Sequence, residues 1–285
     1  LDLKLAQFHP AGKVVMDAGS GFGVTLLCLA ALKPRLALGT EVFSPMATSA
    51  QVLADRFASQ LPVQTVRGSV HEFPFTPGSV DFIYCNEAIS HFLDPDRFLV
   101  DSARILAPGG KLMICDGNNG ANPATVAEVH EVWKAFEQGP APQVLHGHKI
   151  ETPYESRRIE MLGSWFPEET AETKEKLAWG TFGLHGDQIR EKATAMLREG
   201  SLPTERNSVT TCPVDPIKGD HIENLMYPDR LTERLEGLGL SVKVYAHFGG
   251  AKSTWVELAN RVLRAMTPLT LSRARSFKLV ATQRG

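Results

Sequence analysis

Residues 14–23 of the chain read Val-Val-Met-Asp-Ala-Gly-Ser-Gly-Phe-Gly. Apolar residues lead to Asp17, glycines follow at every second position, and a helical pattern of apolar residues begins at Val24. A strand that runs into a glycine turn and then into a helix is typical of nucleotide-binding α/β folds. Glycine suits such a turn because it adopts positive φ and lets a ligand lie against the backbone. The stretch therefore predicts a cofactor site.

The first 117 residues alternate predicted strands with helices or long connections. We expect strands at residues 13–17, 36–41, 62–67, 80–85 and 111–115, the last of them preceded by a turn at 108–110. This alternation predicts a mostly parallel sheet with both faces covered. Further strands are expected at 241–247 and 277–282, and further helices at 228–237 and 253–265. The fold class is therefore α/β.

Residues 118–221 interrupt this alternation. They contain helical stretches at 123–138, 153–165, 168–179 and 187–198 and no convincing strand. Such a segment is too long for a simple loop. We expect residues 1–117 and 222–285 to form a core and residues 118–221 to form a helical insertion. Because the insertion leaves the fifth strand at the edge where such sheets bind ligands, we expect it to cap the substrate.

The spacing of the glycines separates two classes of cofactor. In the GxGxxG pattern of NAD-binding folds, the third glycine would stand where this chain has Val24. Here it falls one residue early, which gives the pattern acid-x-Gly-x-Gly-x-Gly. With Glu41 at the end of the second strand and the segments 69–75 and 106–111, this pattern resembles the class I S-adenosylmethionine-dependent methyltransferases, type 11/25-like. The resemblance covers residues 13–117 well and 228–285 by strand order only.

The resemblance implies a Rossmann-like, doubly wound sheet of seven mostly parallel strands with the last strand antiparallel. It also implies S-adenosyl-L-methionine as cofactor and S-adenosyl-L-homocysteine as product. Glu41 would accept hydrogen bonds from both ribose hydroxyls, and Val42 would pack on the adenine, whose ring would meet the backbone of Val70. Asp17 would help orient the turn or the cationic amino end of the cofactor. The other expected cofactor residues are Gly19, Ser20, Gly21, Gly23, Ser69 and Asn86.

Two of these residues, Ser69 and Asn86, each have an alternative role. Ser69 stands where many family members have an Asp that accepts from the adenine amino group, so it either contacts adenine or only caps its loop. Asn86 ends the fourth strand beside the expected acceptor, and we assign it to the cofactor pocket rather than to catalysis. The sequence that begins there, Asn-Glu-Ala-Ile, is not the Asn-Pro-Pro-Tyr type of enzymes that methylate amino groups of nucleic acids.

Candidates on the acceptor side are fewer. His91 follows the fourth strand and is the candidate general base, although a surface histidine at the start of a helix is the commoner role. In the insertion, the candidate substrate contacts are His148 and, on the helix expected at 153–165, Tyr154, Arg157 and Arg158. The alternative for that helix is a solvated face. We expect a plain loop and no metal site at 146–148, because the two histidines there lack Cys, Asp or Glu at ligand spacing.

Composition bears on partners and location. A net charge of −2 gives no footprint for nucleic acid, and no apolar run approaches the length that spans a bilayer. Four cysteines without CxxC spacing predict reduced thiols in a cytoplasmic protein. The chain starts at Leu1 rather than Met, so we expect upstream sequence. The oligomeric state stays open.

These observations predict an S-adenosylmethionine-dependent methyltransferase that acts on a small-molecule acceptor through an O, N or C nucleophile. Two alternatives from other classes remain. A non-catalytic regulatory module would bind the cofactor without methylating an acceptor, and a nicotinamide oxidoreductase would bind NAD(H) instead.

Overall fold

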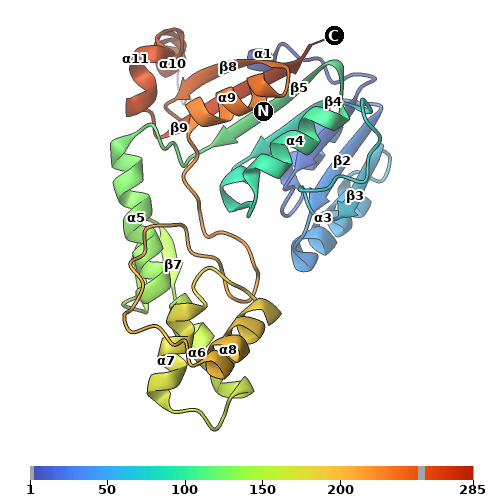
Figure 1. Ribbon diagram of the computed structural model, residues 1–285. Coiled ribbons are helices and arrows are strands. Elements are labelled where there is room, and N and C mark those ends of the chain that lie inside the picture. The colour runs from blue at the N-terminus through green and yellow to red at the C-terminus, as the bar shows by residue number, and fades with distance from the viewer. Residues whose placement is uncertain (1–2, 250–253, 285) are drawn as a thin grey trace. The chain divides into compact units, whose positions relative to one another are not determined.

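A computed structural model describes residues 3–249 and 254–284, and it divides the chain into two compact units (Figure 1). The core unit comprises Leu1–Pro123 and Met226–Gly285. The inserted unit comprises Ala124–Leu225. Each unit has an apolar core of its own. Residue 253, where the sequence predicted a helix to begin, lies outside the described residues.

A seven-stranded sheet forms the centre of the core unit, with the strand order β3-β2-β1-β4-β5-β9-β8. Neighbouring strands are parallel except where β9 pairs, because β9 runs antiparallel to both β5 and β8. The strands are β1 (Val14–Ala18), β2 (Leu36–Glu41), β3 (Val63–Arg67), β4 (Val80–Asn86), β5 (Leu106–Asp116), β8 (Leu240–His247) and β9 (Ser276–Gln283). The expected α/β fold, with its last strand antiparallel, is confirmed.

Helices cover both faces of this sheet. Met16 and Ile83 pack on one face against α4 and α9, whereas Val15 and Phe82 pack on the other against α2. Burial on both faces explains why the strands are almost continuously apolar. The helices of the core unit are α1 (Leu3–Ala6), α2 (Val24–Ala30), α3 (Ser44–Phe57), the 3-10 helix η1 (Ile89–His91), α4 (Pro95–Ile105), α9 (Pro228–Gly237), α10 (Thr254–Ala265), α11 (Thr267–Thr270) and the 3-10 helix η2 (Leu271–Arg273).

The predicted turn at residues 108–110 is wrong. Strand β5 already begins at Leu106 and continues through these residues to Asp116. Val80 of β4 pairs with Leu106, and Phe82 pairs with Lys111, so two steps along β4 correspond to five along β5. The Pro-Gly-Gly sequence therefore forms an irregularity within a strand, which bends the strand without ending it.

The inserted unit contains a strand pair that the sequence did not predict. Gln143–Leu145 (β6) and His148–Ile150 (β7) pair antiparallel. Both turn residues between them, His146 and Gly147, have positive φ, at 48° and 88°. That combination fits the two-residue hairpin turn which Asn-Gly usually marks. The expected plain loop at 146–148 is thus a hairpin turn, and the helices around it are α5 (Pro123–Gln138), α6 (Tyr154–Trp165), α7 (Ala171–Gly180) and α8 (Asp187–Glu199).

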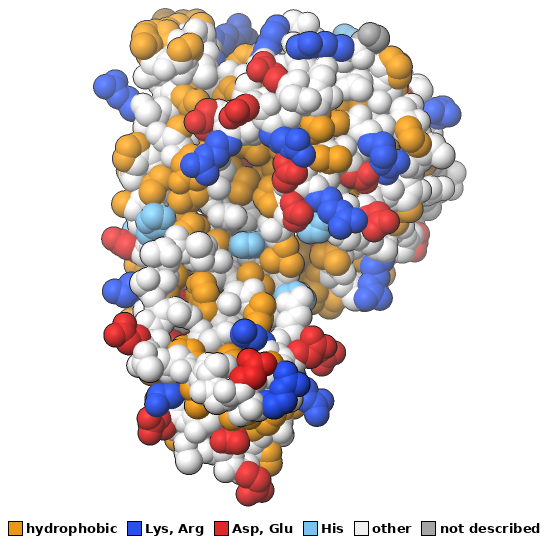
Figure 2. All heavy atoms as spheres, in the orientation of Figure 1, with side chains coloured by type: hydrophobic (Ala, Val, Ile, Leu, Met, Phe, Trp, Pro, Cys, Tyr) orange, Lys and Arg blue, Asp and Glu red, His pale blue; other side chains and the backbone are white. Residues whose placement is uncertain are grey.

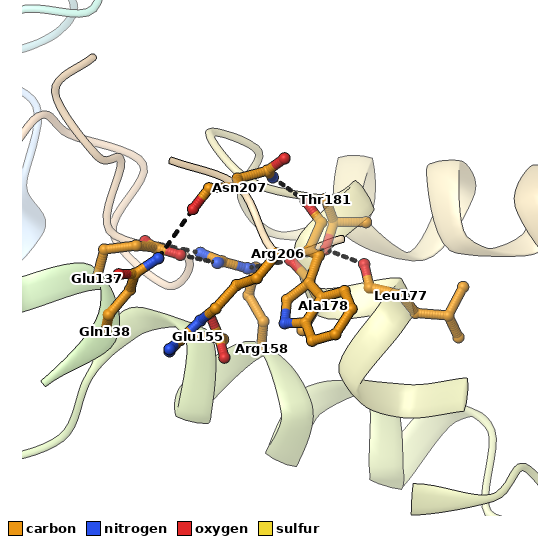
Figure 3. Close-up of polar contacts among 10 residues, drawn as sticks. Glu137, Gln138, Glu155, Arg158, Leu177, Ala178, Thr181, Arg206 and Asn207 are labelled. Carbon is orange, nitrogen blue, oxygen red and sulfur yellow. Dashed lines mark hydrogen bonds and ion pairs between the residues drawn. The ribbon is translucent and has the colours of Figure 1, made fainter. Parts of the chain in front are cut away.

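A buried arginine ties three helices of the inserted unit together (Figure 3). Arg158 of α6 is fully buried, forms an ion pair with Glu137 of α5, and donates from Nε to the carbonyl oxygen of Ala178 in α7 at 3.0 Å. The prediction of a solvated helix face is therefore wrong for this residue. Burying a guanidinium is tolerable only with such partners, because a lone buried charge costs several kcal/mol.

Within the described ranges, no helix is both long and apolar enough to pass through a membrane.

Candidate functional site

The glycine turn joins β1 to α2 at the carboxyl edge of the sheet. Strand β1 ends at Ala18, and Gly23 is the N-cap of α2 in a left-handed conformation, with φ 85°. Gly19 and Gly21 also have positive φ, at 71° and 52°. L side chains rarely adopt such angles, so the turn depends on glycine at all three positions.

The space around the three glycines separates their roles. A Cβ at Gly19 would lie 2.8 Å from the Cβ of Ala88, and a Cβ at Gly23 would lie 2.8 Å from the Cβ of Ala50. Packing of the protein on itself thus requires glycine at these two positions. A Cβ at Gly21 would meet nothing within 4 Å. Gly21 is therefore the point of the turn where a ligand can approach the backbone.

Glu41 ends strand β2 beside the turn, since β2 is the parallel neighbour of β1. Its Oε2 accepts from the backbone N–H of Gly21 at 3.0 Å, and its Oε1 accepts from the N–H of Phe43 at 2.8 Å. These bonds fix the carboxylate at the turn. Carboxylate oxygens have further lone pairs, so Glu41 can still accept hydroxyl hydrogens.

Asp17 is the most strongly perturbed group at the turn. It is 2% exposed, and its Oδ2 has no hydrogen-bond partner among the described residues. Burial raises the pKa of Asp17 to about 7, and the nearby charge of Glu41 raises it further, against a backbone hydrogen bond from Leu26. A buried carboxylate with an unused oxygen is an acceptor for a cationic ligand group.

These groups fit S-adenosylmethionine. The unpartnered Asp17 Oδ2 matches its cationic amino group, and the open backbone at Gly21 leaves room for it. Glu41 is placed to meet a diol such as the ribose. The cofactor carries no phosphate, so the turn needs no phosphate cradle.

The other predicted cofactor residues lie around this centre. The N–H of Ser20 donates to the carbonyl of Thr40 at 2.9 Å, which holds the turn on β2. Val42 follows Glu41 and is 64% exposed, so its side chain is available for packing on a ring. Ser69 Oγ accepts from the N–H of His71 at 3.1 Å and thus caps its own loop, and Val70 is buried. Contact of the loop with adenine stays a prediction.

A cavity of about 300 Å³ lies at the carboxyl ends of β4 and β5, beside the end of β8 and the start of β9. The polar residues that line it include Tyr84, Asn86, Glu87, Asp116, His247 and Lys278. The sequence predicted only Asn86 among them as a site residue. Glu87 has φ 48°, an unusual angle for a non-glycine residue, and such angles are often found at functional sites.

The candidate general base does not line this cavity. His91 lies in η1 directly after β4 and is partly buried. Near it, the carboxyl of Asp116 is fully buried, and this burial raises the pKa of Asp116. A catalytic role for His91 stays a prediction.

The predicted substrate contacts of the insertion have partners within the inserted unit. Tyr154 is buried at a ring distance of 5.6 Å from Phe136, and burial raises the pKa of its hydroxyl. Arg157 pairs with the buried Asp215 at 3.1 Å. His148 Nε2 lies 3.7 Å from a carboxylate oxygen of Glu223. Contact of these side chains with a substrate stays a prediction.

No cluster of three or more His, Cys, Asp or Glu side chains suited to a metal ion occurs at residues 3–249 and 254–284.

Residues 16–114 match the family model described as "Methyltransferase domain". This span contains the glycine turn, Glu41 and Asn86. Over these residues the chain is similar to methyltransferase domains, which is the class of protein that the resemblance implied, and the cofactor of that class is S-adenosylmethionine. This match favours a methyltransferase over the alternative of a nicotinamide oxidoreductase.

Several known proteins are similar to the chain. It is 31% identical over 118 residues to a tRNA U34 carboxymethyltransferase of Syntrophotalea carbinolica, which covers 40% of this chain and 36% of that protein. It is 28% identical to an O-methyltransferase of Aspergillus sclerotiorum over 44% of this chain and 48% of that protein. The chain thus spans between about a third and a half of the length of these relatives.

One solved structure shows the same fold. An S-adenosylmethionine-dependent methyltransferase from Mesorhizobium loti aligns with a TM-score of 0.50 and 14% identity, over 99% of this chain and 95% of that one.

Proposed function

We propose that this protein transfers a methyl group from S-adenosylmethionine to a small-molecule acceptor. The observation that carries the proposal is the arrangement at the turn. A buried carboxylate with an unused oxygen, an open glycine backbone and a second carboxylate fixed one strand away lie together at the carboxyl edge of the sheet. Ligands of such sheets bind at that edge.

Glu41, Val42 and Asp17 have different roles in binding the cofactor. Glu41 accepts hydrogen bonds from the ribose hydroxyls, at about 1.5–3 kcal/mol for each charge-assisted bond. Val42 packs on the adenine, and Asp17 holds the cationic amino end. When bound, S-adenosylmethionine supplies a methyl group on positively charged sulfur. The protein contributes binding, orientation and exclusion of water.

The proposal of a small-molecule acceptor rests on the charge of the protein. The net charge is −2, and on the face shown in Figure 2 Lys and Arg side chains alternate with Asp and Glu side chains. Proteins that bind nucleic acid usually gather positive charge on one face. A relative named as an O-methyltransferase favours an oxygen nucleophile, whereas a relative named for tRNA U34 makes tRNA the second candidate acceptor.

We further propose that residues 118–221 cap the substrate and so select the acceptor. The support is topological, because the chain enters this segment directly from the carboxyl end of β5. Arg157 is the variant of choice for a first test. Its exchange for Gln would change which acceptors are used while leaving cofactor affinity unaltered.

The proposed function is tested by a methyl-transfer screen. Purified protein is incubated with S-adenosylmethionine and either a library of small hydroxy, amino and thiol compounds or unmodified tRNA, and S-adenosylhomocysteine release is measured. We expect turnover with at least one small compound, and at limiting S-adenosylmethionine we expect Glu41→Gln to turn that compound over more slowly than the wild type. Methylation of tRNA alone would overturn the acceptor class. Cofactor binding without any turnover would favour the regulatory module.

A further inference from the structure

The cavity at the ends of β4, β5, β8 and β9 is built by the register of the sheet. Asn86 of β4 pairs with Cys115 of β5, and Cys115 pairs with Lys278 of β9. Paired residues point to the same face of a sheet, so this row places the Asn86 amide and the Lys278 ammonium on one face. His247 stands at the end of β8 opposite Ser276, two residues from Lys278 along β9 and therefore on the same face.

The β4–β5 side of this cavity is acidic. Glu87 directly follows β4, and its Oε2 accepts from the backbone N–H of Gly117 at 2.9 Å. That bond and the left-handed backbone of Glu87 hold its carboxylate at the cavity. Asp116 adds a second carboxyl group, which accepts from the N–H of Ser90 at 3.3 Å and of Asn118 at 2.8 Å.

The β8–β9 side offers donors instead. Lys278 presents an ammonium group, and the His247 imidazole can donate a hydrogen bond in either charge state. One compact cavity thus has carboxylates along one side and nitrogen donors along the other. A ligand with a negative end and a positive end complements both sides.

The cavity adjoins the residues that we assign to the cofactor. Tyr84 lines it, pairs with Asp17 across β1 and β4, and donates from its hydroxyl to Asn86 Oδ1 at 3.1 Å. One edge of the cavity is therefore one strand from Asp17. A ligand seated there would lie next to the methionine end of the cofactor.

We propose that this cavity binds the methyl acceptor and that the acceptor is a small amino carboxylate. Lys278 and His247 hold its carboxylate, and Glu87 faces its amino group. The inference rests on the proposed function and adds the acceptor class to it.

Two observations restrict the size and the charge of the ligand. At about 300 Å³ the cavity is at the lower end of ligand pockets, so the ligand is compact. The two carboxyl groups on one side also disfavour a doubly charged phosphate, because unlike the carboxylate it brings excess negative charge close to Glu87 and Asp116.

The test uses four matched probes of similar length. They are 4-aminobutanoate, 4-aminobutanamide without the carboxylate, 4-hydroxybutanoate without the ammonium, and 3-aminopropyl phosphate. Their affinities for the full chain are measured by saturation-transfer NMR, with S-adenosylhomocysteine at saturation so that the cofactor's own amino acid end already occupies its place. We expect 4-aminobutanoate to bind at least about tenfold more tightly than each of the others, which corresponds to about 1.4 kcal/mol.

Variants assign the two sides. Lys278→Met should weaken the binding of 4-aminobutanoate about tenfold and leave the affinity for 4-aminobutanamide unchanged. Glu87→Gln should leave the affinity for 4-hydroxybutanoate unchanged. The control Lys243→Met removes an exposed lysine of β8 that does not line the cavity, and it should change neither affinity. Melting temperatures of all variants exclude unfolding as the cause.

Three results would overturn the proposal. They are equal affinity for all four probes, tighter binding of the phosphate, and displacement of 4-aminobutanoate by S-adenosylhomocysteine, which would assign the site to the cofactor's own end. Calorimetry of the wild type with S-adenosylmethionine distinguishes failure of the acceptor-site proposal from failure of the proposed methyl-transfer function. If the cofactor binds and the probes do not, the acceptor site fails while the proposed function stands.

Discussion

Asp17 combines two properties that a merely structural aspartate rarely has. It is almost fully buried, and one of its oxygens has no partner among the described residues. Burying a carboxylate without full hydrogen bonding costs free energy, so the folded protein holds the proton to a pKa of about 7. A cationic ligand would remove that cost. Asp17 thus stores in the free protein a free energy that ligand binding can release.

Asp17→Asn tests this account through the pH dependence of stability. The folded pKa of about 7 lies above the ordinary value of 3.8, so stability from the bound proton is complete below about 4 and is lost as the pH rises through 7. In urea unfolding without ligand, the free energy of unfolding of the variant should rise relative to that of the wild type between pH 5 and pH 8, by a few kcal/mol at most. The exposed Asp55→Asn serves as control, and a difference independent of pH would contradict the raised pKa.

Gly21→Ala separates ligand approach from backbone strain. The positive φ should cost about 1–2 kcal/mol of stability in an L residue, and no neighbouring atom adds a clash. Gly78 is a matched control, because it has φ 68° and equally open surroundings away from the turn. We expect similar losses in melting temperature for both alanine variants, but at least about a tenfold loss of S-adenosylmethionine affinity only for Gly21→Ala. If Gly21→Ala and Gly78→Ala bound S-adenosylmethionine with equal affinity, the ligand would not lie against Gly21.

At the scale of elements, α6 depends on a single charge. Arg158→Met leaves the Glu137 carboxylate buried without its partner, which should cost about 3–5 kcal/mol. Arg198→Met removes an exposed arginine of α8 and should change stability by less than about 1 kcal/mol. Tryptophan fluorescence during urea unfolding reports mainly on the inserted unit, since Trp133, Trp165 and Trp179 lie there.

The double variant Glu137→Leu/Arg158→Met completes this test. It removes both charges and should recover part of the loss. A single Arg158→Met variant as stable as Arg198→Met would show that the ion pair does not hold the three helices together.

The elements of the core could be predicted because their signals are local. Helix α9 begins at Pro228 and strand β4 ends at Asn86, within one residue of what proline, glycine and apolar runs indicated. The hairpin β6–β7 was missed because a histidine, rather than Asn or Asp, adopts the left-handed angle at its turn. The burial of Arg158 was missed because it depends on Glu137, which the sequence places on another helix.

The same distinction applies to the site. Glu41 ends strand β2 and Asp17 is the last residue but one of strand β1, and these positions in neighbouring parallel strands bring the two acidic residues together. His247 and Lys278 carry no comparable local signal. They reach the cavity only through the antiparallel register of β8 and β9 with β5, which the sequence pattern does not specify.

At the scale of the whole molecule, the family model matches only residues 16–114, which hold the turn and most of the first five strands. The similarity to the family model therefore lies in the part that we assign to the cofactor. The inserted unit and the strands β8 and β9 lie outside that span. Acceptor choice is accordingly the property in which this protein should differ most from its relatives.

The most direct test of the account is calorimetric titration of the wild type and of Glu41→Gln with S-adenosylmethionine, S-adenosylhomocysteine and NADH. We predict that the wild type binds the first two ligands and not NADH. Glu41→Gln should weaken S-adenosylmethionine at least tenfold, about 1.4 kcal/mol, whereas the exposed Glu72→Gln should not. Binding of NADH alone, or an unchanged affinity in Glu41→Gln, would contradict the account.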